Sequence, residues 1–123
     1  MGLDMYAYVD RPKAIVIGEP EMMETVEFMY WRKVRQIHNF MEHIWRNKGN
    51  EGEFNLVELD LDKPILDTLE MYILNPETHI DDAGFFFGNG ELSTEDIQDT
   101  MGFIKTAREE VEKGNRVYYS SWW

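Results

Sequence analysis

Apolar and polar residues alternate over residues 3–9, at the start of the chain. One set of alternate positions holds the aliphatic side chains of Leu3, Met5, Ala7 and Val9, and the other holds Asp4, Tyr6 and Tyr8. Because neighbouring side chains of a strand point to opposite faces, this pattern predicts a strand with one aliphatic and one tyrosine-rich face. A second short β-like run at 13–17 is expected to form a hairpin with it.

The period changes after Pro20. Apolar residues then recur every three or four positions, at Val26, Tyr30, Val34, Ile37, Met41, Ile44 and Trp45. That spacing is typical of an amphipathic helix, and acidic residues near its start and basic residues near its end suit the helix macrodipole. The pattern predicts one long helix over roughly 21–48, with Tyr30, Val34, Ile37, Met41 and Ile44 buried.

Capping residues predict two further helices. Asp62 is a good N-cap for a helix that ends near Leu74, and Ser93 with Asp96 matches a capping box for a helix that runs to Lys113. Short strands are expected at 54–59, 85–87 and 117–123, the last pairing with 3–8 or 85–87 and burying Tyr118 or Tyr119. The fold class is therefore predicted as α+β, with a sheet of three to five strands packed against about three helices.

The chain has 123 residues and 14% aromatic residues, which is enough material for one domain over 1–123. It has no cysteine, so disulfides, thiol catalysis and Cys-ligated metal are excluded, and a cytoplasmic setting is expected. A membrane span is not expected, since no apolar run approaches 18 residues. No secretory signal is recognised at the start of the chain.

The negative charge is unevenly distributed. The net charge is −12, and residues 51–99 hold fourteen acids and only one base, Lys63. Binding to nucleic acid or to anionic membranes is disfavoured, because phosphate recognition needs an excess of Lys and Arg. The acidic segment is either a solvated surface or an attractive surface for a basic partner.

Four segments occur in order along the chain: GLDMY at 2–6, YWRK at 30–33 followed by Ile37 and His38, GFFFG at 84–88, and YYSSW at 118–122. The set resembles a family of small uncharacterised proteins found in bacteriophage and bacterial genomes. The resemblance spans the chain and implies a phage or prophage-type origin. It implies no activity, cofactor or site residue.

Two groups of side chains are candidates for a ligand or partner surface. Trp31, Arg35 and His38 step along one edge of the expected helix, where an arginine beside a tryptophan can stack on a planar group and a histidine can titrate near neutral pH. The alternative is that Trp31 borders the core and His38 bonds locally. If the first and last strands pair, Asp4, Tyr6, Tyr8, Tyr119 and Ser121 form an aromatic and hydroxyl surface, unless helices cover it.

No catalytic or metal motif is recognised. Asp60 and Asp62 fail the EF-hand spacing, and His79 with Asp81 and Asp82 has no recognised zinc spacing. Gly-x-Ser-x-Gly, Gly-x-Gly-x-x-Gly and Walker patterns are absent. We therefore expect no catalytic residue, no metal and no cofactor.

The leading hypothesis is a phage-type accessory protein that binds a host protein with a basic surface, as an inhibitor or modulator and without catalysis. The alternative is a small-ligand binder or small hydrolytic enzyme, whose pocket would be lined by Asp4, Tyr6, Arg35, His38 and Tyr119. An acidic mimic of nucleic acid is a weaker third possibility, because twelve basic residues dilute the acidic surface. The oligomeric state is not predicted.

Overall fold

The computed structural model describes residues 2–13, 17–18, 22–75 and 92–123. Within these ranges the elements are, in order, β1 (Asp4–Pro12), β2 (Met23–Arg32), α1 (Arg35–Asn47), β3 (Leu59–Asp60), α2 (Lys63–Leu74), α3 (Thr94–Glu112) and β4 (Arg116–Trp122). These elements confirm the α+β class, with a small sheet packed against helices.

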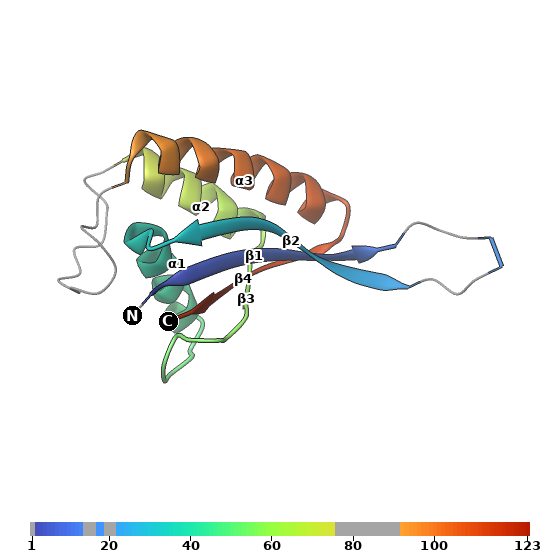
Figure 1. Cartoon of the computed structure of the whole chain (residues 1–123), viewed down its shortest axis with the longest axis horizontal. Coiled ribbons are helices and arrows are strands. Elements are labelled where there is room, and N and C mark those ends of the chain that lie inside the picture. Colours follow the sequence, from blue (N-terminus) through green and yellow to red (C-terminus); the bar gives the residue numbers. More distant parts are fainter. Residues whose placement is uncertain (1, 14–16, 19–21, 76–91) are drawn as a thin grey trace.

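The strands form an antiparallel sheet in the order β2-β1-β4-β3 (Figure 1). β1 lies between β2 and β4, and the register places Asp4 opposite Trp122, so the two ends of the chain lie side by side. The prediction that 117–122 pairs with 3–8 is confirmed. Tyr119 has no exposed surface and Tyr118 is 6% exposed, as expected for the last strand.

The alternation in β1 is also confirmed. Leu3, Met5, Ala7 and Val9 are all buried against the helices, whereas Tyr6 and Tyr8 are only half-buried on the opposite face. The aliphatic side chains fill the core because burial of apolar surface is the main favourable contribution to folding.

The single long helix expected over roughly 21–48 is wrong in its first half. Residues 23–32 form the strand β2, and only residues 35–47 are helical as α1. Val34, Ile37 and Met41 are buried as expected, but Ile44 is half-buried and Tyr30 is 45% exposed. The longest of the described helices is α3, with 19 residues.

A β-bulge explains why the strand was not recognised. Ala7 pairs with Met29 and Tyr8 with Glu27, so Phe28 is an extra residue on β2. An extra residue shifts the alternation of faces by one position. The apolar positions Val26 and Phe28 therefore have one parity, and Met29 and Trp31 have the other. The apolar residues of this segment therefore do not recur at every second position. The four-residue spacing of Val26 and Tyr30 is instead the spacing typical of a helix.

The boundary between β2 and α1 also lacks a local signal. Lys33 has a positive φ of 56°, and its amide donates to the carbonyl of Leu3 at 2.8 Å. The N-cap position of α1 is Val34, which offers no side-chain acceptor. The turn is thus held by a contact with Leu3, the residue before β1, and not by capping chemistry.

The two capped helices begin where they were predicted. Asp62 accepts a hydrogen bond from the amide of Ile65, and α2 ends at Leu74. Ser93 and Asp96 form the reciprocal capping box at the start of α3. Here the signal lies within one turn of chain, so it does not depend on tertiary contacts.

The helices pack on the face of the sheet that carries Met5 and Ala7. The Trp31 indole of β2 meets Phe103 of α3 and donates to the Thr100 hydroxyl at 3.1 Å. α2 and α3 run side by side (Figure 1), and Arg108 of α3 pairs with two carboxylates of α2, Asp67 and Glu70.

The remaining expected strands have different outcomes. The segment 54–59 forms strand only at Leu59–Asp60, paired with β4. Of the expected strand 13–17, residues 14–16 lie outside the described residues, and β1 pairs instead with β2. The expected strand 85–87 also lies outside the described residues.

Candidate functional site

The face of the sheet opposite the helices carries a row of tyrosines. Side chains directly opposite one another on paired strands share a face. Tyr6 of β1 is flanked by Tyr30 of β2, and Tyr8 is flanked by Glu27 of β2 and Tyr118 of β4. We call the surface the tyrosine face; its residues are Asp4, Tyr6, Tyr8, Asp10, Thr25, Glu27, Tyr30, Arg32, Arg116, Tyr118, Ser120 and Trp122.

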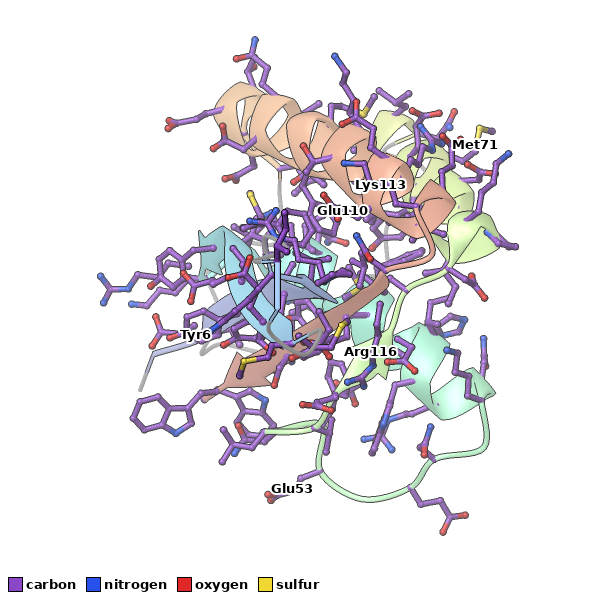
Figure 2. The ribbon with its side chains drawn as sticks, turned by 90° about the vertical axis from the view of Figure 1, so that its right-hand side faces the viewer. Tyr6, Glu53, Met71, Glu110, Lys113 and Arg116 are labelled. Atoms are coloured by element: carbon purple, nitrogen blue, oxygen red, sulfur yellow. The ribbon has the colours of Figure 1, made fainter. Side chains whose placement is uncertain are left out.

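The four tyrosine rings form a continuous chain. The ring centroids are 5.4 Å apart for Tyr30 and Tyr6, 6.0 Å for Tyr6 and Tyr8, and 5.4 Å for Tyr8 and Tyr118. In Figure 2, Tyr6 lies to one side of the sheet, while α1 and α2 lie to the other. Trp122 lies on the same face, opposite Asp4, and is 60% exposed. The rings sit on strands, so their positions are held by the ladder hydrogen bonds.

Carboxylates accept from the hydroxyl groups of this face. Tyr30 donates to Asp4 at 2.6 Å, and Thr25 donates to Asp10 at 2.6 Å. Tyr118 also donates to Asp10, at 3.4 Å. These bonds fix the orientation of the phenol groups at both ends of the row.

The tyrosines stay protonated well beyond neutral pH. Burial raises the pKa of Tyr6 and Tyr8 above the ordinary value of 10.0, and the negative charge of Glu27 raises the pKa of both further. The hydrogen bond to Asp4 raises the pKa of Tyr30. The surface therefore presents O–H donors and ring faces, and it does not present phenolate bases.

One of the two arginines of this face, Arg116, stacks on a ring of the row. The Arg116 guanidinium is 4.1 Å from the centre of the Tyr118 ring. It also pairs with Asp60 at 2.7 Å, with Glu58 at 3.1 Å and with Asp10 at 3.6 Å. This cover explains why Tyr118 is nearly buried although no described helix packs on it.

The structure divides the eight residues predicted as a ligand or partner surface between two places. Asp4, Tyr6 and Tyr8 lie on the tyrosine face. The other five are buried on the helix side of the sheet or in α1: Trp31, Arg35, His38, Tyr119 and Ser121. The eight residues therefore do not form one surface.

The buried residues have structural partners. His38 is 1% exposed, and its Nδ1 atom is hydrogen-bonded to the Tyr119 hydroxyl at 2.9 Å. Burial raises the pKa of Tyr119 well above 10.0, and a hydrogen bond with Ser121 partly offsets this effect. The expected pocket is not assembled from its five residues, since Asp4 and Tyr6 lie on the opposite face from His38 and Tyr119.

Parity along β4 decides this division. The sequence shows that Tyr118 and Trp122 share one face and Tyr119 and Ser121 the other, but it does not show which face joins Tyr6 and Tyr8. In the register Tyr8 lies opposite Tyr118. Tyr118 and Trp122 therefore lie on the tyrosine face, and the predicted residues Tyr119 and Ser121 do not. Tyr30 and Glu27 are absent from the predicted surface because the spacing of apolar residues in their segment predicts a helix, whereas the segment forms β2.

Among the described residues, no group of three or more His, Asp or Glu side chains is arranged to hold a metal ion. The expected candidates His79, Asp81 and Asp82 lie outside those residues. In the part of the chain that is described, no helix has the length and apolar character needed to cross a membrane.

Fold and site together define a small α+β protein whose sheet has one helix-covered face and one aromatic, carboxylate-rich face. Comparison of the chain with protein-family models, with curated proteins and with solved structures finds no significant match.

Proposed function

We propose that this chain is a phage-type accessory protein that inhibits or modulates a host protein. Its tyrosine face would bind a basic surface of that host protein. The observation that carries the proposal is the exposed aromatic row itself. The Tyr6 ring contacts the rings of Tyr8 and Tyr30 on a sheet face that no described helix covers. Tyrosine and tryptophan are enriched among the few residues that carry most of the binding energy of protein interfaces.

The charge of the surrounding surface favours a basic partner. The face and its border at β3 hold two arginines, Arg32 and Arg116, against five carboxylates: Asp4, Asp10, Glu27, Glu58 and Asp60. The whole chain adds a net charge of −12, which raises the rate at which a positively charged partner arrives. The acidic segment 51–99 contributes to the proposed contact through its members at β3.

The proposal is tested by capturing partners from lysate of the host with three forms of the protein. The wild type is compared with Tyr6→Ser/Tyr30→Ser and with Met71→Ala. Met71 is 63% exposed on α2, away from Tyr6 in Figure 2, and so serves as the matched control. We expect the wild type and Met71→Ala to capture the same protein and the tyrosine variant to lose it.

The captured protein then allows a kinetic test. We expect its association rate to fall between low and moderate salt, because exposed charges act mainly on association and are screened by ions. A partner that the tyrosine variant captures as well as the wild type would place the contact elsewhere. A rate that does not change with salt would remove the basic surface from the proposal.

A further inference from the structure

We propose that the tyrosine face recognises arginine: the guanidinium of an arginine in the partner protein lies over the Tyr6 and Tyr8 rings and pairs with Glu27. This inference rests on the proposed function and names the chemistry of the contact. The first argument is the chain's own arginine. Arg116 stacks on Tyr118 while its nitrogens meet the carboxylates of Asp60 and Glu58.

A tyrosine ring beside a carboxylate occurs again at the neighbouring tyrosine of the row, Tyr8, where no described arginine covers the ring. Tyr8 contacts Tyr118 through its ring, and Glu27 stands directly opposite Tyr8. Glu27 is exposed, and its carboxylate makes no hydrogen bond or ion pair with any residue within the described ranges. Its charge still reaches the row, since it raises the pKa of both Tyr6 and Tyr8. The position thus has ring faces and an available carboxylate.

The exposure of the rings shows which part of the row is open. Tyr118, whose ring is covered by the Arg116 guanidinium, is 6% exposed. In contrast, Tyr6 and Tyr8 are half-buried and Tyr30 is 45% exposed. A guanidinium placed over Tyr6 and Tyr8 would cover them as Arg116 covers Tyr118. It would also form an ion pair with Glu27, as Arg116 does with Asp60 and Glu58.

The two ends of the row are less suitable for an incoming cation. The Asp4 carboxylate already accepts from Tyr30, and Arg32 stands opposite Asp4 in the register. A second cation at that end would meet the charge of Arg32. At the other end Arg116 occupies Tyr118. The middle of the row, between Tyr6, Tyr8 and Glu27, is the position that remains.

Arginine fits this position better than lysine does. A guanidinium is planar, so it can stack on a ring and pair with a carboxylate in its own plane, whereas an ammonium group is a compact and strongly hydrated charge. A phosphate or an anionic lipid would instead be repelled by Glu27 and Asp10. The contact with an exposed ring adds about two- to five-fold in affinity over charge alone, which corresponds to about 0.5–1 kcal/mol.

The experiment uses the full chain and two capped peptides of equal length and charge, hexa-arginine and hexa-lysine, with affinities measured by calorimetry and contacts mapped by amide chemical shifts. We expect the arginine peptide to bind more tightly than the lysine peptide, by up to about the two- to five-fold that a ring contact supplies. The largest shifts should fall on Tyr6, Tyr8 and Glu27. Equal affinity for the two peptides would overturn the inference.

Matched variants separate ring and charge. Tyr8→Phe keeps a ring and should keep the arginine preference, whereas Tyr8→Leu should lose it. Glu27→Gln should weaken binding of the arginine peptide more than Glu53→Gln, which removes the same charge from an exposed position away from Tyr6 (Figure 2). Thermal melts that match the wild type confirm that each variant is folded. Equal losses for Glu27→Gln and Glu53→Gln would show a diffuse charge effect and overturn the inference.

The two proposals fail in different ways. If arginine and lysine peptides bind equally but the captured partner still needs Tyr6 and Tyr30, the proposed function stands and the arginine inference falls. If the arginine preference holds but no captured protein depends on those tyrosines, the arginine site stands and the proposed function falls.

Discussion

The two faces of β1 are built from alternate residues of one strand and have opposite environments. Met5, Ala7 and Val9 are buried under the helices, whereas Tyr6 and Tyr8 lie between them in sequence and are half exposed on the other face. The covered face is aliphatic and serves packing. The open face keeps large side chains that have both an apolar ring and a hydroxyl, which suits a surface that must be stable in water and still bind.

Two adjacent tyrosines of β4 show the same contrast within one residue type. Tyr119 is fully buried, and its hydroxyl is hydrogen-bonded to His38. Tyr118 lies on the tyrosine face and is covered by Arg116. Burial raises the pKa of both, and that of Tyr119 much more. The two rings differ in what excludes water from them: the packed core surrounds Tyr119, whereas a single arginine side chain covers Tyr118.

The largest expected effect comes from removing β4. Deletion of 117–123 takes away the central partner of β1 and buried residues such as Tyr119. A single buried aromatic truncated to Ala costs about 3–5 kcal/mol, which is comparable to the stability of a small domain. We expect the truncated chain to show no cooperative thermal transition by circular dichroism. A native-like cooperative melt would show that the terminal strand is an appendage.

The covered face is tested next by a single deletion of side-chain volume. Ile37→Ala should lower the free energy of unfolding by about 2–5 kcal/mol, because Ile37 is fully buried. Ile44→Ala, on the same helix at a half-buried position, should lower it by clearly less. Denaturant titration measures both. Equal changes in the two variants would contradict the assigned orientation of α1.

At alkaline pH the covered face should account for a larger loss of stability than the open face, because the pKa of Tyr119 is raised more than that of Tyr8. The unfolded chain loses the Tyr119 proton near pH 10.0, whereas the folded chain keeps it because burial raises its pKa. The contribution to stability is therefore complete below pH 10.0 and is lost as the pH rises above it. Denaturant titrations over this range should show a shallower decline for Tyr119→Phe than for the control Tyr8→Phe. Identical declines would contradict the prediction.

The smallest expected effect is on the open face. Trp122→Ala should change the free energy of unfolding by no more than about 0.5 kcal/mol, since Trp122 is 60% exposed. The same denaturant titration measures it, with Ile37→Ala as the reference for a buried position. If Trp122→Ala instead lowers the free energy of unfolding by several kcal/mol, the open face contributes substantially to folding stability.

Local patterns were sufficient for much of the fold. The strand at 3–9, the helix that follows Asp62 and the helix that follows Ser93 were all predictable, because alternation and capping act within a few residues. The pairing of 117–122 with 3–8 was also anticipated, as one of two alternatives. The candidate site was predicted only in part, through Asp4, Tyr6 and Tyr8.

The sequence by itself determined which strand had an aliphatic side, where two helices begin, and that the negative charge gathers in 51–99. Only the tertiary structure decided that residues 23–32 are a strand, since the bulge at Phe28 hides its alternation and pairing with β1 stabilises it. Tertiary structure also decided that Tyr118, and not Tyr119, joins Tyr8 on the open face. A shift of one residue in register reverses the face of every side chain in a strand, and register is set by contacts between segments far apart in the chain.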